Sequence, residues 1–141
     1  MITAMVLHVG KKPLRSRRDQ LRASADRVHG TRDAATVCLL LFYAAECGLK
    51  ERLLDRGGHS DTSALENTHD LRKLAKDLRL PRMVSKHLER LQRCRLHRSR
   101  RNTVDVAELH QAWRYGAKLD AADEKEADAA LRALISWCEQ D

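Results

Sequence analysis

The chain has 141 residues, with 27 Lys or Arg against 20 Asp or Glu and a formal net charge of +7. This length predicts one domain over residues 1–141, and 43% hydrophobic but only 4% aromatic residues favour helices packed through Leu and Ala over a sheet. No segment has the roughly 20 uninterrupted apolar residues of a membrane span, and the start lacks a signal peptide's order, so we expect a cytoplasmic protein without a membrane partner.

The first half of the chain predicts three helices of an all-α fold. The basic N-terminal segment, residues 1–30, contains a helix from about Pro13 to Val28. An almost unbroken apolar run follows and predicts a central helix from about Thr31 to Asp55, surrounded by the others. After a polar loop from His59 to about Asn67, Thr68 is the expected N-cap of a short helix.

The second half predicts three further helices. Pro81 breaks the chain, and helical spacing of apolar residues resumes from Arg82 to about Leu96. The run from His97 to Arg101 is too polar for a core, so we expect a loop or a frayed end. Helices from about Val104 to Tyr115 and from Ala121 to Glu139 complete a single antiparallel bundle of five to six helices.

Charge is distributed unevenly along the chain. Residues 72–101 contain twelve Lys or Arg against two Asp or Glu, a difference of +10, whereas residues 118–141 contain three against seven, a difference of −4. The Arg-rich segment, residues 90–101, predicts binding to phosphates through counterion release, largely independent of base sequence. We therefore expect a nucleic acid such as RNA as a partner, and the alternatives are an acidic protein or the acidic C-terminal helix of a second copy of this chain. The expected nucleic-acid-binding residues are Arg93, Arg95, Arg98, Arg100 and Arg101.

Motifs for other chemistries are missing from the sequence. It has no phosphate-binding loop, dinucleotide fingerprint, zinc-protease motif or paired CxxC. The four Cys and seven His are scattered without ligand spacing, so we predict no metal and no cofactor. The cysteines lie mostly in apolar stretches, which is typical of buried thiols in a reducing compartment.

Three segments in order resemble the HEPN family (higher eukaryotes and prokaryotes nucleotide-binding), whose members are small helical bundles. The segments are FYAAECGLKERLL at Phe42 to Leu54, THDLRKLAKDL at Thr68 to Leu78, and WRYG at Trp113 to Gly116. The resemblance covers about residues 32–139 and implies a HEPN-like helical bundle.

The resemblance implies one of two functions. Many HEPN proteins are metal-independent endoribonucleases of toxin-antitoxin or phage-defence systems, and two protomers form a composite site, which implies a homodimer. Other members are non-catalytic and dock a nucleotidyltransferase-type antitoxin or a larger effector protein. A third interpretation, a DNA-binding helix-turn-helix after Pro81, is weaker because the connection from Leu96 to Val104 is too long and too charged.

The catalytic candidates combine a histidine, which moves a proton near neutral pH, with an arginine, which binds a phosphate. The family motif pairs an Arg and a polar residue with a later His, and Arg101, Asn102 and His110 match it only with eight intervening residues, more than usual. His110 and Arg114 are four residues apart and share a helical face.

Two other pairs have the motif spacing, Arg82 with His87 and Arg90 with His97. On a continuous helix, only Arg90 and His97 share a face. His69, at the start of the short helix, we interpret with Asp70 as a capping and packing residue. Trp113 and Trp137 are expected in or near the core instead of stacking on bases.

Overall fold

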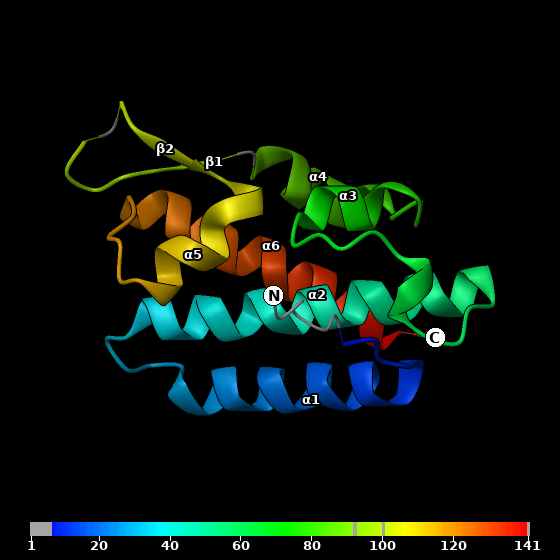
Figure 1. The fold of residues 1–141 in the computed structure, drawn as a ribbon. Coiled ribbons are helices and arrows are strands. Elements are labelled where there is room, and N and C mark those ends of the chain that lie inside the picture. Colours follow the sequence, from blue (N-terminus) through cyan, green and yellow to red (C-terminus); the bar gives the residue numbers. More distant parts are fainter. Residues whose placement is uncertain (1–6, 92, 100, 141) are drawn as a thin grey trace, which may run out of the picture.

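The computed structural model describes residues 7–91, 93–99 and 101–140, which form six α-helices and a two-stranded sheet (Figure 1). The helices are α1 (Lys11–Val28), α2 (Ala34–Gly57), α3 (Leu71–Lys76), α4 (Arg82–Arg90), α5 (Leu109–Arg114) and α6 (Ala121–Glu139). The strands are β1 (Arg93–Arg95) and β2 (Thr103–Asp105), and two short 3-10 turns are η1 (Thr62–Ala64) and η2 (Val106–Glu108). The prediction of a mainly helical fold is confirmed, with the small sheet as an addition.

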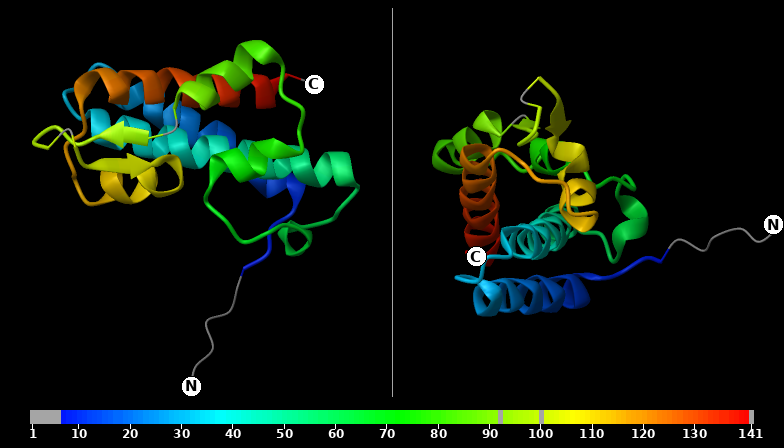
Figure 2. Two further views of the ribbon diagram at one scale, coloured as in Figure 1. Left: turned by 90° about the horizontal axis from the view of Figure 1, so that it is seen from above. Right: turned by 90° about the vertical axis from the view of Figure 1, so that its left-hand side faces the viewer.

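Helix α2 is the central element of the core. It lies between α1 on one side and α3, α5 and α6 on the others (Figures 1 and 2). Leu41, Phe42 and Leu49 have no exposed surface, as the unbroken apolar run predicts. Asp33 caps the start of α2, and Gly58 ends it in the left-handed conformation, with φ of 67°.

The three long helices are not all antiparallel. Helix α1 runs antiparallel to α2, since Lys11 pairs with Asp55 near one end and Arg15 pairs with Glu51 a turn further. Helix α6 instead begins at the same end of the molecule as α2 and runs in the same direction (Figures 1 and 2). The predicted antiparallel bundle therefore needs correction, because residues 58–120 carry the chain back to the start of α2 before α6 begins.

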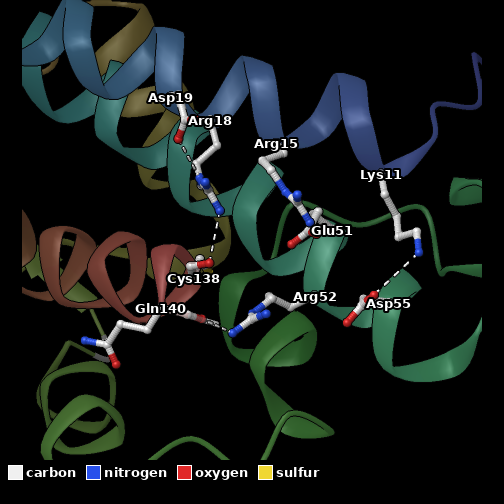
Figure 3. A network of polar contacts seen from close by, with 9 residues as sticks. All are labelled: Lys11, Arg15, Arg18, Asp19, Glu51, Arg52, Asp55, Cys138 and Gln140. Carbon is white, nitrogen blue, oxygen red and sulfur yellow. Dashed lines mark hydrogen bonds and ion pairs between the residues drawn. The ribbon is translucent and has the colours of Figure 1, made fainter.

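The C-terminus of α6 is held by arginines of α1 and α2 (Figure 3). Arg18, which is almost fully buried, donates from Nη1 to the carbonyl oxygen of Cys138 at 3.0 Å. Arg52 donates to the carbonyl oxygen of Gln140 and stacks on the ring of Trp137, 5.4 Å from its centroid. Because the last carbonyls of a helix lack partners within it, these bonds fix the end of α6 against α1 and α2.

The segment between α4 and α5 differs from the prediction. The expected helix from Arg82 to Leu96 ends at Arg90, and the chain then forms an antiparallel hairpin of β1 and β2. Cys94 pairs with Val104 at the centre of the hairpin, where Cys94 is fully buried. Val104 therefore belongs to a strand, and the helix expected from Val104 to Tyr115 is shortened to α5.

Other boundaries agree more closely with the sequence. Helix α6 spans the predicted range, and α1 starts two residues before Pro13. The N-cap of α3 is Asp70, whose carboxylate accepts from the Arg72 N–H at 3.0 Å, instead of Thr68. None of the helices described is both long and apolar enough to cross a membrane.

Candidate functional site

Three segments that are far apart in the sequence bring a carboxylate and two imidazoles together. Glu46 comes from α2, His69 from the residue pair before α3, and His110 from the first turn of α5. The Glu46 Oε1 atom lies 2.7 Å from His69 Nδ1, and the His69 and His110 ring centroids are 5.0 Å apart. Lys50 donates to the other oxygen of Glu46 at 3.0 Å. We name Glu46, His69 and His110 the histidine cluster.

Local structure explains how each side chain reaches the cluster. Tyr43, Glu46 and Lys50 are three and seven residues apart on α2, so they lie on one face of the helix. The cap of α3 by Asp70 fixes the backbone next to His69. In α5, His110 follows the short turn η2, which packs beside α3.

The two imidazoles have different environments. His110 is only 5% exposed and packs on Phe42, with ring centroids 5.2 Å apart. Its Nδ1 is buried without a hydrogen-bond partner in the described part of the chain. The side chain of His69 is 52% exposed, so the cluster is open to solvent on the His69 side.

Burial lowers the pKa of His110 below its ordinary value. The nearby charges of His69 and Arg114 lower this pKa further, while the carboxylates of Glu46 and Glu108 oppose the shift. His110 is therefore a neutral imidazole at neutral pH, with a ring nitrogen able to accept a proton. Glu46 instead lies against His69, with its Oε1 atom 2.7 Å from His69 Nδ1.

The lowered pKa of His110 predicts a pH-dependent stability. Below the ordinary value of 6.5, the unfolded chain binds a proton at this position more readily than the folded chain. The folded state is therefore fully stable, with respect to this group, above pH 6.5. Its free energy of unfolding decreases as the pH falls from 6.5 toward the lower pKa of the folded state. We expect the Tm of His110→Phe, relative to that of the wild type, to rise as the pH is lowered from about 8 to about 5, because Phe does not bind a proton. Equal pH dependence of Tm in both proteins would contradict this expectation.

Arg114 places a cation beside the histidine cluster. Its side chain is exposed, it donates to the Tyr43 hydroxyl, and its guanidinium carbon lies 6.0 Å from the ring centroids of both Tyr43 and Tyr115. Tyr43 also neighbours His110, with ring centroids 6.4 Å apart. His110 and Arg114 therefore both lie beside Tyr43, which agrees with their position on one face of the helix.

The other catalytic candidates lie elsewhere. Arg90 is exposed at the end of α4, and His97, Arg101 and Asn102 belong to the hairpin and its loop. Asn102 donates from its side chain to the Ser99 hydroxyl at 3.2 Å. Within the residues described, none of these four forms a hydrogen bond or ion pair with the histidine cluster.

The expected nucleic-acid-binding arginines are of two kinds. Arg93, Arg98 and Arg101 are exposed on the hairpin. Arg95 is paired within the chain, because its guanidinium donates to Asp123 at 2.9 and 3.1 Å, although its side chain is 43% exposed. Arg100 lies outside the described residues.

A cavity adjoins the histidine cluster on the side of α1. It has a volume of about 230 Å³, and its lining includes Glu46, Lys50, Thr62 and Asn67. Among the residues described, no group of three His, Cys, Asp or Glu is arranged to hold a metal ion.

Desolvation raises the pKa of the Cys138 thiol to about 12.

Comparison with known proteins adds no functional label. No protein family model, curated protein or solved structure matches this chain.

Sequence reasoning missed His69 and Glu46 as site residues. One signal was available, because Glu46 is an acidic residue inside the longest apolar run of the chain. A carboxylate in a buried helix needs a partner nearby, so an unassigned histidine was a reasonable candidate for that partner.

Proposed function

We propose that this chain is a HEPN-like protein that binds RNA and cleaves it at the histidine cluster without a metal ion. The observation that carries the proposal is the placement of two imidazoles 5.0 Å apart, one held by a carboxylate and the other buried. A histidine with a lowered pKa beside a second imidazole and a carboxylate from separate segments is a frequent mark of an active site.

The chemistry assigns a different role to each imidazole. His110, whose pKa is lowered by burial, accepts the proton of the ribose 2′-hydroxyl, directly or through one water. The 2′-oxygen attacks the phosphorus, and the bond to the 5′-oxygen of the next nucleotide breaks. His69, which is hydrogen-bonded to Glu46, acts as the general acid and gives a proton to that leaving oxygen. The products are a 2′,3′-cyclic phosphate and a 5′-hydroxyl.

Two cations near the cluster support phosphate binding. Arg114 is exposed beside Tyr43, and Lys50 lies next to Glu46. A fixed positive charge close to the phosphate stabilises the negative charge that develops in the transition state. The +10 charge of residues 72–101 favours a polyanionic substrate over a small neutral one.

The proposal extends to the setting that the resemblance implies. We propose a homodimer that acts in a toxin-antitoxin or phage-defence system. Sedimentation of the purified chain tests the dimer separately from the chemistry.

The decisive experiment is incubation of the purified protein with a fluorescent single-stranded RNA in excess EDTA. We expect cleavage that resists the chelator and leaves 2′,3′-cyclic phosphate ends. An all-deoxy oligonucleotide of the same sequence is the control and should stay intact, because it lacks the attacking hydroxyl. Absence of RNA cleavage by the wild-type protein would overturn the catalytic proposal.

A non-catalytic docking module is the second candidate function. It is favoured by the low exposure of His110 and by its packing on Phe42, which are features of a core residue. In that case the partner is a nucleotidyltransferase-type antitoxin or a larger effector. Absence of cleavage together with tight binding to such a partner would support this candidate.

A further inference from the structure

Two adjoining hollows flank the segment between α5 and α6. One has a volume of about 390 Å³, and its lining includes Arg32, His97 and Lys118. The other, of about 370 Å³, is lined in part by Arg98 and again by Lys118. The hollows share residues 116–118, so they form one continuous surface, which we name the basic groove.

The floor of the basic groove is fixed by backbone contacts. Leu96 and Leu119 form an isolated antiparallel bridge, and the His97 N–H donates to the Lys118 carbonyl at 2.9 Å. Gly116 adopts a φ of 76°, which a side chain would disfavour. The cationic residues from the hairpin and from the connection to α6 therefore keep a constant spacing.

The charges of the basic groove are available to a ligand. Within the described residues, no hydrogen bond or ion pair engages the side chains of Arg32, Arg98 or Lys118. Two carboxylates also lie in the lining, so the two hollows together hold three Lys or Arg against two acidic residues. Asp33 caps α2, and Glu124 accepts from the indole N–H of Trp113 at 3.1 Å.

An exposed aromatic residue directly precedes the basic groove in the chain. Tyr115 is 77% exposed and directly precedes Gly116 of the groove. Its other neighbour in the chain is Arg114, whose guanidinium lies over the Tyr115 ring. An exposed tyrosine beside fixed cations is a platform on which an unpaired base can stack.

We infer that the basic groove binds the phosphodiester backbone of single-stranded RNA, with an unpaired base stacked on Tyr115. Arg32, His97 and Lys118 contact successive phosphates, and the strand continues past Arg114 toward His110. Single-stranded RNA is favoured over a duplex because the bases of a duplex are stacked on each other and are not available to Tyr115. This inference names the substrate class of the proposed function and rests on it for the direction of the strand.

The test measures binding of a fluorescent 2′-O-methyl oligonucleotide, which cannot be cleaved through the 2′-oxygen, to the full chain. We expect the double variant Arg32→Gln and Lys118→Gln to bind about tenfold more weakly at about 0.1 M salt. The slope of log affinity against log salt should fall by about 1.4, because each single-strand phosphate contact contributes about 0.7. The matched control is Lys12→Gln with Arg17→Gln, which removes two exposed charges from α1. Equal losses in the two double variants would overturn the inference.

Tyr115 separates base stacking from charge. Tyr115→Ala should weaken binding of the single strand about tenfold, while Tyr115→Phe should bind as the wild type does. Binding of a duplex of equal length should be the same for all three proteins. Loss of duplex binding in Tyr115→Ala, or unchanged binding of the single strand, would overturn the stacking role.

The inference and the proposed function fail separately. Binding at the basic groove without cleavage of ordinary RNA would remove the catalytic proposal and leave the groove. The opposite result is that the groove variants cleave a dinucleotide and bind the oligonucleotide as the wild type does. It would reject the basic groove as a binding site and leave the catalytic proposal standing.

Discussion

His69→Gln and His110→Gln are each expected to lower the single-turnover rate of RNA cleavage by at least about a hundredfold at saturating RNA. Each variant removes one of the two proton transfers that the reaction requires. The double variant should be little slower than either single variant, since groups that act in one step are not additive. Quantification of cleaved RNA over time in EDTA measures all three rates.

The controls for this prediction come from the hairpin and from the carboxylate. His97→Gln should weaken RNA binding, because His97 lines the basic groove, but should keep the wild-type rate at saturating RNA, because it lies outside the histidine cluster. Glu46→Gln should lower the rate less than loss of His69, because the imidazole remains but loses its charged partner. Wild-type rates in both His69→Gln and His110→Gln would contradict the assignment, and a loss in His97→Gln alone would move the site to the hairpin.

The helices that could be predicted from the sequence are those that one strong pattern defines. The apolar run of α2 and the apolar stripe of α6 each extend over several turns, and their positions agree with the structure. The hairpin has strands of three residues, too short for an alternating pattern to stand out from a helical one. Its position depends on a tertiary contact, the bond from the Arg95 backbone N–H to Asp123 at 2.8 Å.

The direction of α6 relative to α2 also could not be predicted from local sequence patterns. Short loops favour antiparallel neighbours, and a bundle read from sequence order alternates up and down. Here α1 and α2 follow that rule, but residues 58–120 contain two short helices, the hairpin and α5 before α6 starts. Only the packing of this whole segment decides which end of α2 receives the start of α6.

Two side chains at or beside the candidate site, His110 and Arg114, were predicted from the sequence, and Glu46 and His69 were not. His110 and Arg114 share a helical face, and that relation depends on the local helix alone. The approach of Glu46 and His69 to His110 joins positions 23 and 41 residues apart, so no local pattern shows it. The interpretation of His69 as a packing residue was drawn from its place at a helix start, and Asp70 alone performs the capping.

Gly48→Ala is expected to destabilise the fold by about 1–2 kcal/mol, although alanine is the better helix former by about 1 kcal/mol. A methyl group at this position of α2 would lie 2.9 Å from Cys138 Sγ and 3.1 Å from Arg18 Cδ. Both neighbours are fixed, since Arg18 is bonded to the Cys138 carbonyl and both side chains are almost fully buried (Figure 3). Overpacking therefore outweighs the gain in helix propensity. Urea unfolding of the two proteins measures the difference.

A double-mutant cycle identifies the cause of this loss. Cys138→Ala alone should cost about 1 kcal/mol, because it leaves a small cavity. Combined with Gly48→Ala, it removes the sulfur from the new methyl group, so the double variant should be more stable than the sum of the two losses. An additive result would show that the methyl group is accommodated by movement of Arg18 instead. Enhanced stability of Gly48→Ala would contradict the close approach of α2 and α6 at this position.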